Sequence, residues 1–233
     1  MSAPAESHYE GQDLEALADM PRYYEWIMQW FRPHLSGRVL EVGAGAGNFT
    51  VHYVDAATEV VLVEPAANLL ERLRSRFADR TNVSILHADV AGVGGKFDAA
   101  VLVNVLEHVP DDEGTLRRLF DLLRGGGTLL LFVPALPWLY GSLDRLVHHA
   151  RRYTRASLER VVLGAGFEIR AVRYFDALGV LPWLVAGRVL HAQTFSRRAS
   201  VLYDRLAVPL ASIVERRIAP PLGKNLVCVA QRP

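Results

Sequence analysis

The sequence is poor in the features that mark disulfide-stabilised, nucleic-acid-binding and membrane-spanning proteins. Its 233 residues include one cysteine, Cys228, so no disulfide can form within the chain, and a reducing compartment fits. The 26 basic and 25 acidic side chains leave a formal net charge of +1, which gives no global reason to expect nucleic acid as a partner. One uncharged run of 19 residues, 125–143, opens with three glycines and contains two prolines, so it predicts a buried strand and a loop rather than a membrane span.

The N-terminal residues lack the pattern of a secretion signal. Residues 1–19 contain the acids Glu6, Glu10, Asp13 and Glu15 and no apolar core of the kind that signal peptides have. We therefore expect the protein to stay in the cytoplasm.

What the sequence does contain is a regular alternation of apolar strands and amphipathic helices. Hydrophobic residues make up 51% of the chain, enough to bury one large core. Alternation of this kind is typical of βαβ units and a mostly parallel sheet, and it predicts a single domain over 1–233. The expected strands are 38–42, 59–63, 83–87, 98–103, 128–133, 168–175 and 226–230, and the expected helices are 48–57, 66–78, 111–123 and 154–165.

Two segments fall outside the alternation. Residues 1–35 include Tyr23 and Trp26 in a cluster of aromatic side chains that water does not favour, so we expect a helical lid that packs on the sheet or over its ligand edge. Residues 176–223 separate the last two strands and predict a helical insertion.

A glycine-rich loop follows the first expected strand. Gly43, Gly45 and Gly47 alternate with alanines. Glycine is needed where the backbone turns sharply and approaches a ligand without a Cβ atom in the way. The spacing does not fit the dinucleotide pattern G-x-G-x-x-G, because Asn48 stands where the third glycine belongs. Glu41 also precedes the loop, and its charge would repel a pyrophosphate but suits a ligand with a cationic end. A nicotinamide-dependent oxidoreductase is therefore disfavoured.

The motif Glu41-x-Gly43-x-Gly45-x-Gly47 resembles the first motif of class I S-adenosylmethionine-dependent methyltransferases, and further similarities follow in order. Glu64 matches the acid that holds the ribose hydroxyls in that family, and Asp89 matches the acid that binds the adenine amino group. Residues 104–109, which read NVLEHV, resemble the "LEHV" segment of small-molecule methyltransferases, and 124–127 resemble the turn before the fifth strand, with Gly125 replacing a proline.

The resemblance implies a Rossmann-like α/β fold with helices on both faces of a seven-stranded sheet. Its strand order would be 3-2-1-4-5-7-6, with the last strand antiparallel. It also implies S-adenosylmethionine as the cofactor. The implied cofactor-binding residues are Tyr23, Trp26, Glu41, Gly43, Gly45, Gly47, Asn48, Glu64, Pro65, Asp89, Val90 and Asn104.

A second resemblance concerns residues 148–153, HHARRY, which are similar to a "GHxRRY" element after the fifth strand in a subset of these enzymes. His149 and His108 are the candidate general bases, because a histidine can take a proton near neutral pH. The candidate acceptor-binding residues are Glu107, His148, Arg152 and Tyr153. The arginines could equally be solvated charges ahead of a helix, and His149 could be a loop residue satisfied by backbone.

A metal site is the alternative use of these histidines. Glu107, His108, His148 and His149 form two pairs of adjacent residues, and neighbours on a strand or loop rarely both point at one ion. We therefore expect no metal.

The sequence thus predicts an enzyme that methylates oxygen or nitrogen of a small molecule, with no nucleic acid partner. A cofactor-binding or regulatory protein without turnover is the main alternative, and a methyltransferase for a lipid-linked acceptor at a membrane is another. Leu202, Leu206, Pro209, Leu210 and Ile213 are spaced as on one face of a helix over 200–217. That face could pack on the protein's own sheet, form a homodimer through 176–223, or contact a membrane, which we favour least.

Overall fold

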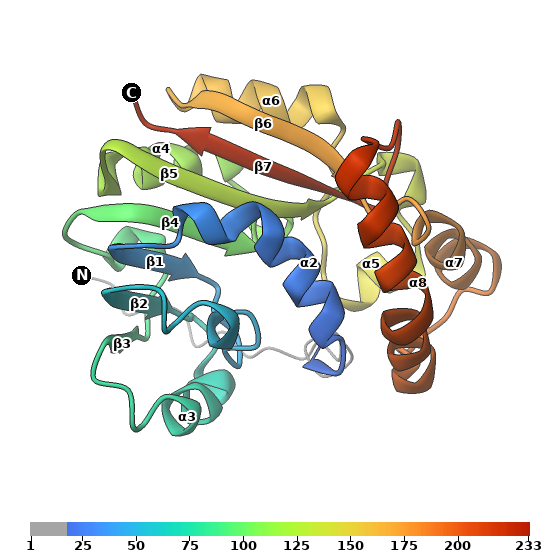
Figure 1. Ribbon diagram of the computed structural model, residues 1–233, viewed down its shortest axis with the longest axis horizontal. Helices are drawn as coiled ribbons and strands as arrows, with labels where there is room; N and C mark the ends of the chain where they lie inside the picture. The colour runs from blue at the N-terminus through green and yellow to red at the C-terminus, as the bar shows by residue number, and fades with distance from the viewer. Residues whose placement is uncertain (1–17) are drawn as a thin grey trace.

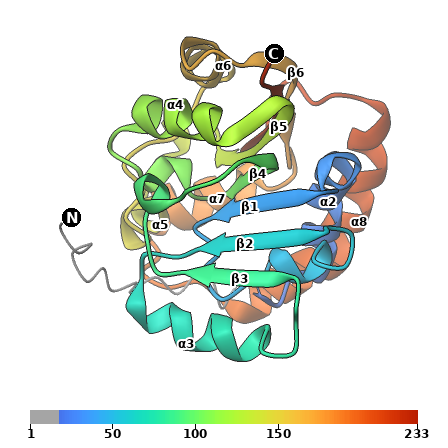
Figure 2. The ribbon, with the colours of Figure 1, turned by 90° about the vertical axis from the view of Figure 1, so that its left-hand side faces the viewer.

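The computed structural model describes residues 18–233 and contains one seven-stranded sheet. The strand order is β3-β2-β1-β4-β5-β7-β6 (Figures 1 and 2). All neighbouring pairs from β3 to β5 are parallel, whereas β7 runs antiparallel to both β5 and β6. The order and the antiparallel last strand are therefore confirmed. The strands are β1 Arg38–Val42, β2 Glu59–Val63, β3 Val83–Leu86, β4 Phe97–Val103, β5 Leu123–Pro134, β6 Glu168–Phe175 and β7 Asn225–Gln231.

Helices cover both faces of the sheet. The α-helices are α2 Pro21–Phe31, α3 Ala67–Arg76, α4 Asp112–Leu122, α5 Ser142–Leu146, α6 Arg155–Gly164, α7 Val180–Leu184 and α8 Arg197–Arg217. Short 3-10 turns are η1 Arg32–His34, η2 Thr50–His52, η3 Val90–Gly92, η4 Leu106–His108 and η5 Pro137–Leu139, and a π-helical turn, η6 Val185–Val189, continues α7. Figure 1 shows α2 in front of the sheet and α4 behind it.

The two faces follow from the alternation of side chains along each strand. In β5, Leu129 and Leu131 belong to the core cluster shared with α4 and α6, whereas Leu130 and Phe132 belong to the cluster shared with α2. Successive side chains of a strand point to opposite faces, so a run of apolar residues serves both layers. The central strands are therefore buried on both sides, and their carboxyl ends meet at one edge.

One expected helix is wrong. Residues 48–57 form only the single 3-10 turn η2 and irregular turns around it. The side chains of Thr50 and Tyr53 explain the difference, because both hydroxyls donate to the buried Glu41 carboxylate, at 2.8 and 2.6 Å. These tertiary hydrogen bonds stabilise a non-helical conformation of the segment, and their contribution outweighs its modest helix propensity.

The N-terminal aromatic residues pack against the sheet. The ring of Trp26 lies 3.9 Å from that of Phe175, and Met28 and Phe31 in α2 are fully buried. The insertion holds this helix by its first turn, since Asp204 of α8 accepts a hydrogen bond from the Tyr23 N–H at 2.9 Å. Residues 1–17 of the expected lid lie outside the described part of the chain.

None of the helices within residues 18–233 combines the length and the apolar character that a membrane span requires.

Asp204→Ala should lower the free energy of unfolding by about 1–2 kcal/mol, because the first turn of α2 loses its side-chain cap. Denaturant unfolding of the variant measures the loss. Arg205→Ala removes the neighbouring exposed side chain and serves as the control, which should unfold like the parent. An unchanged midpoint for Asp204→Ala would contradict the capping role.

A second prediction concerns the pH dependence of stability. Burial raises the pKa of Glu41 to about 7, although the two hydroxyl donors oppose that shift. The folded protein therefore holds this proton more tightly than the unfolded chain does. Stability should fall as pH rises from about 4.5 to about 7, by on the order of 3 kcal/mol from this group alone. Glu41→Gln should flatten this part of the stability profile, measured by unfolding at several pH values, whereas an equally steep decline would contradict the assignment.

Candidate functional site

The glycine loop lies at the carboxyl edge of the sheet, directly after β1. Gly43, Gly45 and Gly47 have φ values of 69°, 57° and 74°, a region that favours glycine. A Cβ at position 43 would lie 2.6 Å from Val105 Cγ2, and one at position 47 would lie 2.5 Å from the Phe77 ring. The loop therefore needs glycine both for its conformation and for its packing.

Glu64 joins this loop to the end of β2. Its two carboxylate oxygens accept hydrogen bonds from the N–H groups of Gly45 and Ala66, each at 2.7 Å, and only 5% of the residue is exposed. Burial raises the pKa of Glu64, although the two backbone donors pull it down. We expected the Glu64 carboxylate to hold a ligand, and in the structure it also fixes the glycine loop.

Further predicted cofactor residues lie in the loops at the same edge. Asp89 is exposed after β3 and accepts hydrogen bonds from Ala91 and Gly92, so it caps η3, which begins at Val90. The Asn48 side chain accepts a hydrogen bond from Arg76 at 2.7 Å, and the Pro65 carbonyl lies 3.1 Å from a ring nitrogen of His87.

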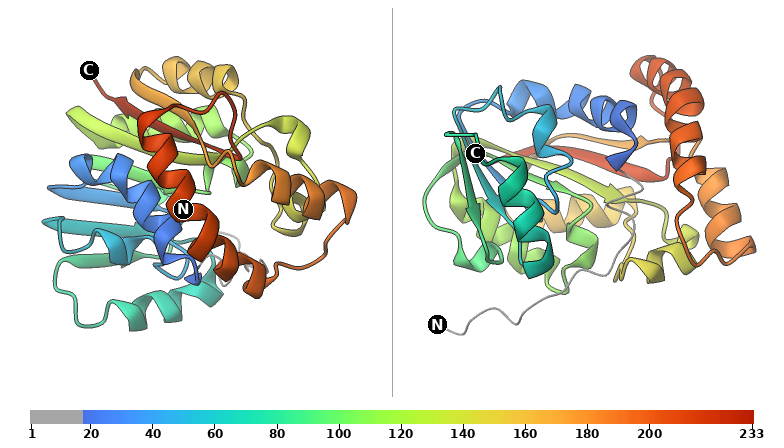
Figure 3. Two further views of the ribbon diagram at one scale, coloured as in Figure 1. Left: turned by 45° about the vertical axis from the view of Figure 1, so that its right-hand side comes forward. Right: turned by 90° about the horizontal axis from the view of Figure 1, so that it is seen from below.

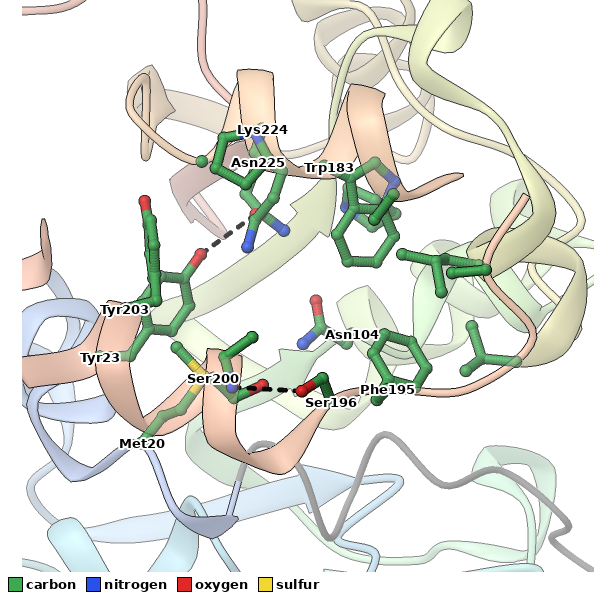
Figure 4. Close-up of a pocket in the computed structure, with 18 of the residues that line it drawn as sticks. Met20, Tyr23, Asn104, Trp183, Phe195, Ser196, Ser200, Tyr203, Lys224 and Asn225 are labelled. Atoms are coloured by element: carbon green, nitrogen blue, oxygen red, sulfur yellow. Dashed lines mark hydrogen bonds between the residues drawn. The ribbon is translucent and has the colours of Figure 1, made fainter. Parts of the chain in front are cut away.

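A cavity of about 320 Å³ lies beside this edge, between α2, the ends of β4 and β5, and the insertion (Figure 4). Asn104, which follows β4 with φ 53°, points its amide into the space between Trp183 and Phe195. Most of the wall is apolar or aromatic, and the sequence-predicted residues that reach it are Tyr23, Asn104, His149 and Arg152.

Buried Asp144 organises the cavity wall around His149, and the sequence analysis assigned it no role. The Asp144 carboxylate lies 2.9 Å from His149 Nδ1, and it accepts hydrogen bonds from Arg152 Nε at 2.6 Å and Gly141 N–H at 3.0 Å. Burial alone would raise the pKa of Asp144, but the bond from His149, the charge of Arg152 and the Gly141 N–H outweigh it and lower the pKa. Asp144 therefore stays ionised and orients the imidazole.

Three of the residues we considered as metal ligands do converge. The ligand atoms of Glu107, His108 and His149 lie within 4.8 Å of one another, and His149 Nε2 is 3.6 Å from Glu107 Oε1. The premise that adjacent residues point apart is thus wrong for Glu107 and His108, because the tight turn η4 brings both side chains to His149. Burial and the neighbouring His149 lower the pKa of His108 to about 4, so this ring is neutral at pH 7.

Lys224, which also lines the cavity, stands among aromatic rings. Its Nζ lies 5.0 Å from the ring centre of Tyr23 and 5.5 Å from that of Trp183, and it pairs with Asp176 at 3.1 Å. The Asp176 carboxylate also accepts a hydrogen bond from the Tyr23 hydroxyl at 3.1 Å. The sequence analysis missed both charged residues, because no motif marks them and their partners are distant in sequence.

Three predicted site residues lie elsewhere. The Trp26 ring is 2% exposed and packs in the core, so it contributes no surface to the cavity. The Tyr153 hydroxyl donates to Asp112 at 2.8 Å and thereby holds the start of α4, which corrects our assignment of Tyr153 to acceptor binding. His148 is exposed in a left-handed conformation, φ 59°, and does not line the cavity within the described residues.

Comparisons with known proteins agree with this geometry. A methyltransferase-domain family matches residues 14–172. A probable S-adenosylmethionine-dependent methyltransferase of Mycolicibacterium smegmatis is 26% identical over 91% of this chain and 88% of its own length. A ubiquinone biosynthesis O-methyltransferase of Xanthomonas campestris is 33% identical over 73% of this chain and 75% of its own length.

The fold is also shared with a solved structure. The N-methyltransferase NodS from Bradyrhizobium japonicum, in complex with S-adenosylhomocysteine, superposes with a TM-score of 0.62 at 14% identity, covering 96% of this chain and 94% of NodS. The family match spans more than half of the chain, and the glycine loop, Glu64, Asp89, Asp144 and His149 lie within it. The chain therefore belongs to the methyltransferase-domain family and is an S-adenosylmethionine-dependent methyltransferase.

Proposed function

We propose that the protein transfers a methyl group to an oxygen of a small, largely apolar molecule bound in the cavity between α2 and the insertion. The observation that carries this proposal is the Asp144–His149 pair in the cavity wall, beside Asn104 at the edge where the glycine loop lies. The similarity to an O-methyltransferase of ubiquinone biosynthesis favours oxygen over nitrogen as the acceptor atom.

The residues at the sheet edge fit S-adenosylmethionine. The loop 43–47 offers a close backbone approach, and the carboxyl groups of Glu64 and Asp89 at successive strand ends are acceptors for hydroxyl and amino donors. Adenosine carries donors of both kinds. When bound, the cofactor supplies a methyl group activated by its positively charged sulfur.

The chain's own residues then have to bind the acceptor and remove its proton. His149 accepts that proton at Nε2, because Nδ1 faces the Asp144 carboxylate. Glu107, 3.6 Å from Nε2, stabilises the imidazolium that forms. His108 stays neutral beside it, so it adds no competing positive charge.

The walls of the cavity select the acceptor. Phe132, Trp183 and Phe195 offer aromatic surface, which suits a ring or an alkyl chain and excludes water from the reacting atoms. Holding the acceptor oxygen in line with the methyl group can supply about 7–11 kcal/mol of the barrier.

Glu64→Ala should weaken S-adenosylmethionine binding by about 1.5–3 kcal/mol, because a charged acceptor is lost and the glycine loop loses its anchor. Isothermal titration calorimetry measures the affinity. Glu71→Ala, which removes an exposed acid of the neighbouring helix α3, is the control and should bind like the parent. Unchanged affinity in a folded Glu64→Ala variant would refute the cofactor assignment.

His149→Ala should lower turnover by about 10²-fold or more while leaving cofactor affinity nearly intact, because the variant loses its general base but keeps the glycine loop. The assay follows transfer of labelled methyl groups from S-adenosylmethionine into a metabolite extract. His34→Ala is the control, because His34 lies in η1 and is not among the residues that line the cavity.

Full activity of His149→Ala would remove this residue from the mechanism. An equal loss in His108→Ala would assign proton removal to the histidine pair. If the parent protein binds the cofactor but labels no product, the regulatory alternative is favoured.

A further inference from the structure

The outer face of α8 is apolar and faces solvent. Leu202, Leu206, Leu210 and Ile213 are 59%, 67%, 60% and 55% exposed. The opposite face, with Asp204, Val208, Ala211 and Glu215, is the one that packs on the protein. The interpretation that the apolar stripe packs on the protein's own sheet is therefore wrong.

A second apolar stripe lies on α7 and η6. Leu181, Val185 and Val189 recur every four residues and are 65%, 38% and 64% exposed. The right-hand view of Figure 3 shows α7 and α8 at the same end of the molecule. Their inner residues, among them Trp183 and Tyr203, line the cavity, so the exposed stripes are the outer surface of the cavity wall.

Within residues 177–223 the exposed charged side chains are all arginines, one of which, Arg197, pairs with Asp19 near the start of α2. Between residues 177 and 223 the only acids are Asp204 and Glu215, and both are buried. The same stretch contains six exposed arginines, Arg188, Arg197, Arg198, Arg205, Arg216 and Arg217. On α8, the positions of Arg198, Arg205 and Arg216 lie along one flank of the leucine stripe, at helical spacing.

We propose that this face, made of α7, η6 and the outer side of α8, binds an anionic lipid surface. An apolar stripe flanked by arginines is the pattern of a helix that lies in the interface of a bilayer, with its apolar side chains in the acyl boundary and its charges at the headgroups. Anionic headgroups supply the negative charge that this face lacks.

A second copy of the chain fits less well. A two-fold dimer brings the same patch against itself, so the arginines of one protomer would meet those of the other, without an exposed acid in 177–223 to pair them. A lipid surface satisfies both the apolar and the charged parts of the face. The proposal is independent of the acceptor, since lipid binding needs neither cofactor nor turnover.

Vesicle flotation of the full chain tests the proposal. The protein should float with phosphatidylcholine vesicles that contain about 30% phosphatidylglycerol, at least about tenfold more than with pure phosphatidylcholine. Binding should weaken between about 0.05 and 0.5 M NaCl, because salt screens the arginines. Absence of binding to the anionic vesicles at low salt would overturn the proposal.

Two variants separate the contributions, each with a matched control. One variant removes apolar side chains, Leu206→Ser/Leu210→Ser/Ile213→Ser, and the other reverses two charges, Arg205→Glu/Arg216→Glu. Each should lower the floated fraction by about tenfold. Leu163→Ser, an exposed leucine of α6, and Arg72→Glu/Arg74→Glu on α3 change the same residue types elsewhere and should float like the parent. Circular dichroism confirms that each variant is folded.

Light scattering tests the alternative, which is self-association of the protein through the same face. The proposal expects the same mass for the parent and the triple serine variant without lipid. A dimer that dissociates in the triple variant, together with no vesicle binding by the parent, would assign the face to self-association and overturn the lipid proposal. Flotation of the triple variant equal to that of the parent would overturn it as well.

Discussion

Burial of carboxylates at the carboxyl edge of the sheet is the constraint on which the rest of the structure depends. An ionised acid cannot be buried without donors around it, so each such residue fixes the groups that satisfy it. Glu64 fixes the glycine loop, Asp144 fixes His149 and Arg152, and Asp176 fixes Tyr23 and Lys224. The elements that we propose contact a ligand are therefore held in place by the protein itself, which is the form of preorganisation that orientation-dependent catalysis requires.

The same principle connects the insertion to the N-terminal helix. Asp204 of α8 caps the first turn of α2, and Glu215 accepts hydrogen bonds from the backbone N–H groups of Asp176 and Ala177. The two acids of α8 thus lie on its inner side, together with Val208 and Ala211. Because the inner contacts are made by acids, the leucines of α8 are left on the surface, where the arginines accompany them. The inverted amphipathicity of α8 follows from how the cavity wall is held in place.

Local patterns in the sequence were enough to predict the strands and the glycine loop. The alternation of apolar residues marked β1, β2 and β6 at their observed bounds, and the spacing of glycines marked the ligand loop. The segment 48–57 was mispredicted because its shape depends on hydrogen bonds from Thr50 and Tyr53 to the buried Glu41. The sequence left the orientation of α8 open, because that orientation depends on two acids within the helix that face the protein. Asp144 was missed because no motif marks it, although its partners His149 and Arg152 are near in the sequence, and Asp176 was missed because its partner Lys224 is distant.

The central claim is that one edge of the sheet holds the cofactor while the adjoining cavity, with His149 in its wall, holds the acceptor. A crystal structure of the protein grown with S-adenosylhomocysteine and a metabolite extract tests it most directly. The account predicts the ribose at Glu64 and additional density in the cavity lined by Asn104, His149 and Trp183. A cofactor bound away from the glycine loop, or an acceptor bound outside this cavity, would contradict it.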